Sequence, residues 1–182
     1  DEVGRGALCG PVVSCCVLLK KEIFENALVN EINDSKKISP RKREVLSSFI
    51  KKNSIYSLGE VSNTEIDNIN ILNATVESMK RALKRFDGFK NIIKVDGQKT
   101  FDYNERTFFV KKGDSVSVSI ASASIVAKTF RDNLMLEYSK EYPNYKWEKN
   151  KGYGTRDHLS AIKQFGPTPL HRKSFLKNLI TQ

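Results

Sequence analysis

The order of apolar runs along this chain is the feature that most restricts its fold. Residues 11–19 (PVVSCCVLL) and 54–62 (SIYSLGEVS) are short and apolar with several β-branched residues, which is typical of strands. Other stretches place apolar residues every three or four positions, which is the periodicity of an amphipathic helix. Strands that alternate with helices predict an α/β domain with a mixed sheet.

Two stretches predict helices with definable starts. In SPRKREVLSSFIKK, Ser39 is expected to cap the helix and Pro40 to occupy its first position. A longer helix is expected over 63–86, with Asn63 or Thr64 as its cap. The apolar positions at helical spacing are Val45, Leu46, Phe49, Ile50, Ile66, Ile69, Leu72, Val76, Met79 and Leu83.

Later parts of the chain continue the alternation. Residues 91–97 (NIIKVDG) and 106–114 (RTFFVKKGD) predict two strands that each run out beside an Asp and a Gly. A helix rich in small residues is expected over 119–142, followed by helices over 155–166 and 171–180.

Length and charge favour one domain that binds a polyanion. A chain of 182 residues with 39% hydrophobic and 29% charged residues is ordinary for one globular domain, here 1–182 with a helical part from about 143 to 182. The net charge is +10, and residues 128–182 hold 11 Lys and Arg against 5 Asp and Glu. A basic surface concentrates phosphates, so nucleic acid is the expected partner, and a merely soluble basic protein is the alternative.

Cysteine placement points to a reducing compartment. Cys9, Cys15 and Cys16 crowd one apolar segment without the spacing of a disulfide framework or a metal site, so they are expected to be small buried side chains. No apolar run approaches the ~20 residues of a membrane span, and no signal peptide precedes the first motif. We expect a cytoplasmic monomer that does not bind membranes.

Four acids stand where an α/β sheet gathers side chains. Asp96 ends an apolar strand, and Asp114 follows Gly113 after the next one. Asp1 and Glu2 open the chain, where an apolar strand is expected to precede them. Because strand ends converge on one crevice, the four acids are expected to share a site, although any one of them alone is more often a turn residue or a helix cap.

A cluster of acids in a basic chain predicts a divalent metal site. Packed carboxylates repel one another unless cations lie between them. Mg²⁺ favours a few carboxylates together with phosphate oxygens. Two such ions ~3.5–4 Å apart can activate water and stabilise the leaving oxygen of a phosphodiester. The expected chemistry is therefore metal-dependent hydrolysis of nucleic acid.

Seven short motifs follow one another along the chain: DEVGRG (1–6), DSKK (34–37), VDG (95–97), KGD (112–114), SIASASIVAKTFRD (119–132), KGYGT (151–155) and GPTPLHRKSF (166–175). In order and spacing they resemble the type 2 ribonuclease H family, in particular bacterial ribonuclease HII. The resemblance extends over the whole chain. Departures from the family pattern are mild, since Ser122 often corresponds to Ala and Gln98 to Asn, and neither position is an acid.

This resemblance implies a ribonuclease H-like fold, with a central five-stranded mixed sheet flanked by helices and a helical C-terminal extension. It implies an endoribonuclease that hydrolyses the RNA strand of RNA/DNA hybrids. Such an enzyme also cuts 5′ of single ribonucleotides in duplex DNA and leaves 3′-hydroxyl and 5′-phosphate ends. The implied catalytic and metal-binding residues are Asp1, Glu2, Asp96 and Asp114, with Mg²⁺ or Mn²⁺ as cofactor.

Two segments match substrate-reading elements of that family. Gly4, Arg5 and Gly6 are similar to its turn that reads the 2′-hydroxyl, where glycine lets the backbone approach a sugar closely. Tyr153 resembles its junction-sensing tyrosine, which would pack against a deoxyribose. The alternatives are a solvated Gly-rich turn and a tyrosine packed in the core.

Basic residues near the second motif are candidates for phosphate contacts. Lys36 and Lys37 are expected to face phosphates, with Arg41, Lys42 and Arg43 close behind. The same run of charge also fits a solvated helix start, which is the alternative interpretation.

Three further polar residues have structural roles in our reading. His158 and His171 are expected to be structural rather than general acids or bases. Asp132 lies 13 residues beyond Ser119, roughly 20 Å along a helix, so Asp114 and Asp132 cannot serve one metal site. A local ion pair is the expected role of Asp132.

Two other functions compete with this interpretation. Ribonuclease HIII shares the first motif but typically carries a long N-terminal substrate-binding domain and Glu as its fourth acid, so Asp114 and the short chain argue against it. A basic duplex-binding module without chemistry is the second. Four intact acids argue against that module, because phosphate binding gains nothing from negative charge.

Overall fold

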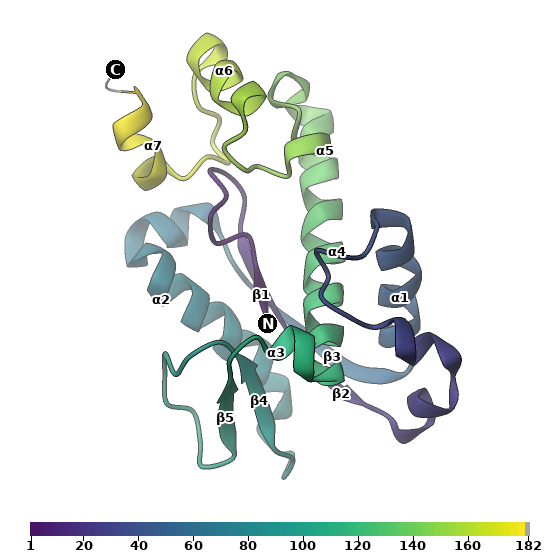
Figure 1. Cartoon of the computed structure of the whole chain (residues 1–182). Helices are drawn as coiled ribbons and strands as arrows, with labels where there is room; N and C mark the ends of the chain where they lie inside the picture. Colours follow the sequence, from purple (N-terminus) through teal and green to yellow (C-terminus); the bar gives the residue numbers. More distant parts are fainter. Residues whose placement is uncertain (181–182) are drawn as a thin grey trace.

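The central feature of the fold is an antiparallel sheet of three strands (Figure 1). The computed structural model describes residues 1–180, with side chains for residues 1–177. β2 (Val12–Leu19) pairs along its whole length with β3 (Ser54–Val61). On its other edge β2 pairs with β1 (Glu2–Val3), so the strand order is β1-β2-β3.

The remaining strands form a separate parallel pair. β4 (Ile93–Asp96) pairs with β5 (Thr107–Val110), and the two strands therefore end at the same edge. The predicted α/β class is confirmed, but no mixed sheet is present among residues 1–180, because one sheet is antiparallel and the other is parallel. The single five-stranded sheet is wrong for the described residues, because the five strands form sheets of three and two.

A cavity of about 400 Å³ lies where the two sheets would have to join. It is lined by residues 14–19 of β2 and 93–95 of β4, together with Asp1. Phe24 and Ile92, which are 59% and 65% exposed, also line it. Both residues of β1 pair with β2, and within residues 1–180 no ladder joins this sheet to β4.

The helices are close to their predicted positions. They are α1 (Pro40–Lys52), α2 (Asn63–Leu83), α3 (Gly113–Val116), α4 (Val118–Glu141), α5 (Trp147–Asn150), α6 (Arg156–Phe165) and α7 (Lys173–Ile180). Short 3-10 helices lie at η1 (Lys21–Glu25), η2 (Ala27–Glu31), η3 (Lys84–Phe86) and η4 (Pro143–Tyr145). The helical character expected beyond about residue 143 is thus present through residue 180.

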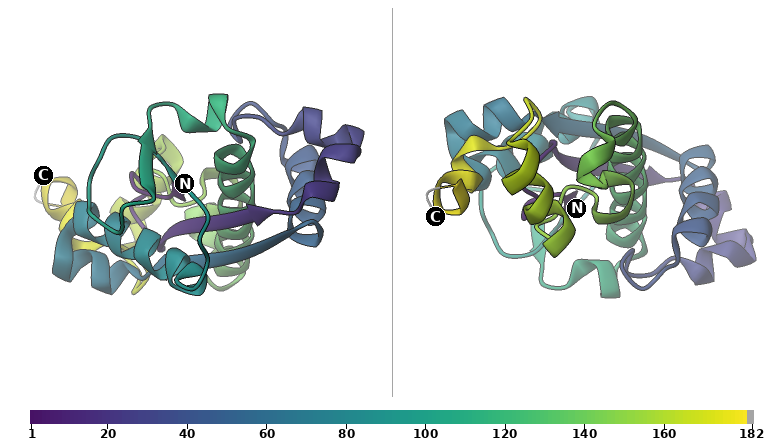
Figure 2. Two further views of the ribbon diagram at one scale, coloured as in Figure 1. Left: turned by 90° about the horizontal axis from the view of Figure 1, so that it is seen from below. Right: turned by 90° about the horizontal axis from the view of Figure 1, so that it is seen from above.

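Side-chain alternation along β2 decides which helices cover which face of the sheet. Val13 and Cys15 join a core with α1 and α4, which includes the small side chains Ala121, Ala123 and Ala127. The intervening Ser14 points the other way, where its Oγ lies 2.6 Å from Oγ of Ser78 on α2. The sheet is therefore covered on both faces (Figure 2).

The starts of the first two long helices show one correct and one wrong prediction. Oγ of Ser39 accepts a hydrogen bond from the amide of Lys42, so the predicted cap of α1 is confirmed. The cap of α2 is Ser62 rather than Asn63 or Thr64, because Ser62 forms a reciprocal capping box with Glu65.

Three of the apolar positions at helical spacing are not in the core. Val45, Ile69 and Leu72 are exposed. In α2 the reason is a kink at Asn70, whose φ of 64° interrupts the helical periodicity. The regular spacing of the sequence therefore does not continue through this helix.

The C-terminal helices pack around their own apolar cluster. Cys9, Met135, Tyr145, Trp147 and Leu176 belong to it. Cys9 and Cys15 are buried and Cys16 is half-buried, all three as free thiols, which agrees with their predicted role as small apolar side chains. Among the described residues, no helix is long and apolar enough to cross a membrane.

Candidate active site

Asp96 and Asp114 are brought together by a backbone hydrogen bond. β4 ends at Asp96, and Oδ1 of Asp96 accepts a 2.6 Å bond from the amide of Gly113. Asp114 is the next residue, in the first turn of α3, and both carboxylates are half-buried. A Cβ on Gly113 would lie 2.4 Å from Cδ1 of Ile120 and 3.0 Å from Oδ1 of Asp96, so any larger residue would have to displace these side chains.

Asp1 and Glu2 reach the same region from β1. The carbonyl of Asp1 accepts a 3.0 Å bond from the amide of Cys15, which seats β1 on the sheet. Asp1 lines the cavity to which β4 and the first turns of α4 also contribute. Because α4 contacts β1, β4 and α3, it is the common neighbour of all the acid-bearing segments.

The four acids have the donor chemistry of a site for a hard divalent cation. Of these four acids, only Glu2 has an ion-pair partner among the side chains of residues 1–177, namely Arg5 at 3.3 Å, and Asp1, Asp96 and Asp114 have none. Partly buried carboxylates without counter-charge in a chain of net charge +10 fit a bound cation. No three of these carboxylates lie within 4.8 Å of one another in the described part of the chain.

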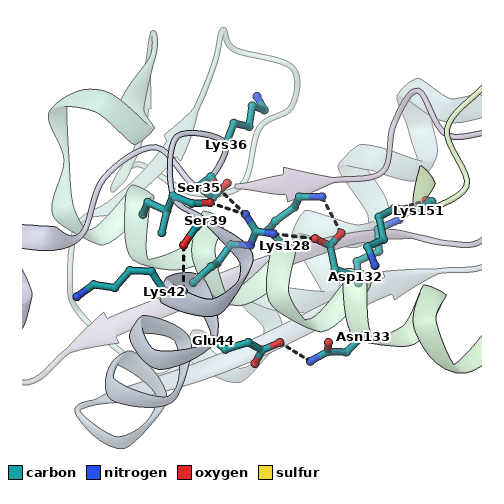
Figure 3. A network of polar contacts seen from close by, with 12 residues as sticks. Ser35, Lys36, Ser39, Lys42, Glu44, Lys128, Asp132, Asn133 and Lys151 are labelled. Atoms are coloured by element: carbon teal, nitrogen blue, oxygen red, sulfur yellow. Dashed lines mark hydrogen bonds and ion pairs between the residues drawn. The ribbon is translucent and has the colours of Figure 1, made fainter. Parts of the chain in front are cut away.

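Asp132 belongs to a different network, on α4 (Figure 3). Its Oδ2 accepts a 3.0 Å bond from Nη2 of Arg43, and its Oδ1 accepts a 2.6 Å bond from Nζ of Lys128. The ion pair predicted for Asp132 is confirmed. Both carboxylate oxygens are used by cations of the protein itself.

The DSKK segment presents two lysines on a fixed backbone. Ser35 is buried, its Oγ lies 2.9 Å from Oγ of Ser124, and its carbonyl accepts a 2.9 Å bond from Arg43. Lys36 and Lys37 are exposed, and Figure 3 shows Lys36 pointing away from the network. Arg43, which was grouped with the phosphate-facing residues, is instead buried and holds this segment from inside.

The Gly4–Gly6 turn rests on two buried arginines that the sequence reasoning missed. Gly4 is buried with φ of +91°, while Arg5 and Gly6 are exposed. Arg172 donates to the carbonyls of Gly4 and Arg5, and Arg131 packs against Gly4. The available signal was an arginine inside a small-residue helix and another inside the specific GPTPLHR motif.

Tyr153 is half-buried beside the same turn. An isolated β-bridge joins Tyr153 to Ala7, and the guanidinium of Arg131 lies 5.6 Å from the centre of the tyrosine ring. The ring is therefore neither fully exposed nor part of the core. Its role in sensing the substrate stays a prediction.

His158 and His171 form a buried network whose protons can be assigned from its partners. Nδ1 of His158 lies 3.0 Å from the carbonyl of Tyr153, so it carries a proton. Nδ1 of His171 accepts a 2.9 Å bond from the amide of Thr168, which places the other proton on Nε2. Nε2 of His158 then accepts from both Nε1 of Trp147 and Nε2 of His171, at 3.0 and 3.1 Å.

This network is structural, as the sequence suggested. Cys9, His158 and His171 offer three ligand atoms within 4.8 Å of one another, but the Nε2 lone pair of His158 is already used by two donors. Burial raises the pKa of the Cys9 thiol to about 12. Burial, and then the nearby His158, lower the pKa of His171 to about 4, so all three groups are neutral at pH 7.

The fold and the site together define a class of protein. The structure superposes on ribonuclease HII from Archaeoglobus fulgidus, solved in a complex with PCNA, with a TM-score of 0.79, 22% identity and coverage of 98% of this chain and 94% of that one. It also superposes on Bst-RNase HIII solved with Mn²⁺, with a TM-score of 0.72 and 16% identity, covering 100% and 68% of the two chains. The chain therefore has a ribonuclease H-like fold, and its four acids have the donor chemistry of a divalent-metal site.

Sequence comparison narrows that class to one family. The model of the family described as Ribonuclease HII matches residues 1–178. Ribonuclease HII of Caldanaerobacter subterraneus subsp. tengcongensis is 49% identical over 181 residues, covering 99% of this chain and 73% of the relative. That of Rickettsia bellii is 47% identical, covering 98% and 89%. The chain belongs to the ribonuclease HII family, and it is a type 2 ribonuclease H that acts on RNA/DNA hybrids.

Proposed function

We propose that this chain cuts the RNA strand of hybrids, and duplex DNA at the 5′ side of single ribonucleotides, by a two-metal mechanism that leaves 3′-hydroxyl and 5′-phosphate ends. The observation that carries the proposal is the contact between the acids and the exposed turn. Glu2 and Arg5 form an ion pair at 3.3 Å, so one acid lies directly against the turn that would meet the substrate. The residues that would cleave the strand therefore lie next to the residues that would recognise the sugar.

Four carboxylates would hold the metal ions in this proposal: Asp1, Glu2, Asp96 and Asp114. Mg²⁺ or Mn²⁺ bound there supplies activation of water and stabilisation of the leaving oxygen. The amide of Gly113 fixes Oδ1 of Asp96, while Oδ2 of Asp96 has no protein partner within residues 1–177 and is left for a cation.

Substrate binding is divided between the turn and the basic surface. The exposed backbone of Arg5 and Gly6 would approach the ribose, where a 2′-hydroxyl can accept a hydrogen bond from an amide. Lys36 and Lys37 would contact phosphates, because they are exposed on a segment anchored from inside. Tyr153 would pack against the neighbouring deoxyribose. We also propose that the protein is a monomer and acts in the cytoplasm.

One assay tests the proposal directly. Duplex DNA with a single ribonucleotide is incubated with the protein in Mg²⁺, in Mn²⁺ and in EDTA. We expect one cut, 5′ of the ribonucleotide, that EDTA abolishes and either metal restores. Cutting that persists in EDTA, or products with 2′,3′-cyclic phosphates, would exclude this mechanism.

The same assay separates the competing functions. A hybrid with an all-RNA strand is the second substrate. A duplex-binding module without chemistry would retard both duplexes in a gel and cut neither. Cleavage of the hybrid without cleavage at the single ribonucleotide would favour an activity like that of ribonuclease HIII. Both results would contradict the proposal as stated.

A further inference from the structure

Two buried guanidinium groups lie beneath the Gly4–Gly6 turn and have no role in the chemistry above. Arg131 and Arg172 are each 0% exposed, and neither has an ion-pair partner among the described side chains. Burying an unpaired charge is unfavourable unless hydrogen bonds compensate for the lost hydration. Each group donates three bonds, all of them to backbone carbonyls.

Arg172 holds two successive carbonyls of the turn. Its Nη2 donates to the carbonyl of Gly4 at 2.8 Å and its Nη1 to the carbonyl of Arg5 at 2.9 Å. Its Nε donates to the carbonyl of Gly10 at 3.0 Å, where the chain returns to the sheet. A planar guanidinium can make these bonds at once, whereas an ammonium group acts as a single point charge.

These bonds decide where the amides of the turn point. In a trans peptide the carbonyl and the following N–H point in opposite directions, and the described chain has no cis peptide. Because the carbonyls of Gly4 and Arg5 point inward to Arg172, the N–H groups of Arg5 and Gly6 point away from it. Both residues are exposed, and neither amide has a partner within residues 1–180. Two adjacent free donors are thus presented at the surface.

Arg131 supports the turn from below and connects it to Tyr153. A Cβ on Gly4 would lie 2.2 Å from Nε of Arg131, so the glycine rests directly on the guanidinium. The same group binds the carbonyls of Cys9, Pro11 and Lys151 and lies against the ring of Tyr153. The turn and the tyrosine are therefore held by one rigid support.

We propose that Arg172 is a positioning residue that sets specificity for ribose, by turning the amides of Arg5 and Gly6 outward to meet a 2′-hydroxyl oxygen. Arg131 is the support that keeps this pair of donors in register with Tyr153. The proposal rests on the proposed function, in which this turn reads the ribonucleotide. It further assigns the conformation of the turn to Arg172, a side chain that does not contact the substrate.

The test compares Arg172→Gln and Arg172→Lys with Arg81→Gln as the matched control. Arg81 also donates to a backbone carbonyl and to two glutamates, but it lies on the exposed side of α2. Nitrogen-15 spectra without substrate report the amides of Arg5 and Gly6. We expect both resonances to move in the two Arg172 variants and to stay in Arg81→Gln. Unmoved resonances in either Arg172 variant would overturn the proposal.

Kinetics then separate positioning from a purely structural role. The value of kcat/KM on a single-ribonucleotide duplex is expected to fall about 100-fold in both Arg172 variants, since a misplacement near 1 Å can cost this much. The dissociation constant for an all-DNA duplex should stay unchanged, because phosphate contacts dominate it. Arg172→Lys keeps the charge but not the fork, so full rescue by lysine would contradict the proposal.

A wild-type measurement covers the case in which Arg172→Gln does not fold. Hydrogen exchange at the amides of Arg5 and Gly6 should slow when a single-ribonucleotide duplex is added in EDTA, and should not slow with the all-DNA duplex. Equal effects of the two duplexes would refute the assigned donors. Failure of the proposed function would show differently, as a wild-type protein that does not cleave the ribonucleotide in Mg²⁺.

Discussion

The amide of Gly113 donates a 2.6 Å hydrogen bond to Oδ1 of Asp96, across 17 positions of the chain. This bond joins the end of β4 to the start of α3 and so places Asp114 beside Asp96. A side chain at position 113 would have to displace Cδ1 of Ile120 on α4, which lies 2.4 Å from the position of its Cβ. The acid pair is thus a product of the contact between these segments.

Asp96→Asn should separate cutting from binding. The Asn carbonyl oxygen can still accept the bond from Gly113, so the fold should persist while one negative charge is lost. We expect turnover to fall by more than about 100-fold, since losing even an outer partner of a metal ligand costs 10–100-fold. Gel retardation of a hybrid should be unchanged. Near-normal turnover would remove Asp96 from the site.

Asp114→Asn and Asp132→Asn should have opposite effects. Asp114 has no ion-pair partner among the described side chains, so its neutral variant should lose turnover and keep its stability, or gain stability without metal as repulsion is relieved. Asp132 compensates buried Arg43 and half-buried Lys128, so its loss should lower the free energy of unfolding by about 3 kcal/mol. Urea unfolding and single-turnover cleavage distinguish the two. The reverse pattern would make Asp132 the fourth ligand.

Tyr153→Ala should impair cleavage at single ribonucleotides, with Tyr153→Phe as its control. The ring lies over Arg131 at 5.6 Å, and phenylalanine preserves that contact while alanine removes it. We expect kcat/KM to fall about 10-fold or more in the alanine variant, equivalent to ~1.4 kcal/mol of lost contact, and to stay near wild type in Tyr153→Phe. An alanine variant that unfolds would instead support a core role for the ring.

Acid should destabilise the protein through the buried histidine pair. Burial and the neighbouring His158 hold the pKa of His171 at about 4, and burial also lowers that of His158, below the 6.5 of an unfolded chain. Below pH 6.5 the unfolded state therefore binds more protons, so this stability is complete above pH 6.5 and is lost as pH falls toward 4. The full effect for His171 is about 3 kcal/mol.

Urea unfolding between pH 6.5 and 5 measures the histidine contribution to the unfolding free energy, because most carboxylates titrate at lower pH. The chain has only two histidines, and both belong to the network. His171→Gln should flatten the dependence of the unfolding free energy on pH over this interval. Identical slopes for the variant and the wild type would show that the pair does not titrate as its burial requires.

Local features were predicted well because their causes are local. The strand at Val12–Leu19 follows from β-branched composition, and the start of α1 follows from Ser39 followed by Pro40. The ion pair of Asp132 was predicted partly from its helical position, and Lys128 lies four residues away in the sequence. The four acids were assigned from their motifs through the family resemblance, and their role stays a prediction.

Other features were decided only by the tertiary structure, because they depend on contacts between segments that are distant in the sequence. Arg131 and Arg172 look like surface charges in the sequence, yet both are fully buried because carbonyls from residues 4–11 converge on them. The division into two sheets depends on which strand edges meet, and the kink at Asn70 removes a periodicity that composition alone would extend. Sequence therefore determined which residue types carry the chemistry. The fold determined their partners, because hydrogen bonds and burial depend on proximity in space rather than along the chain.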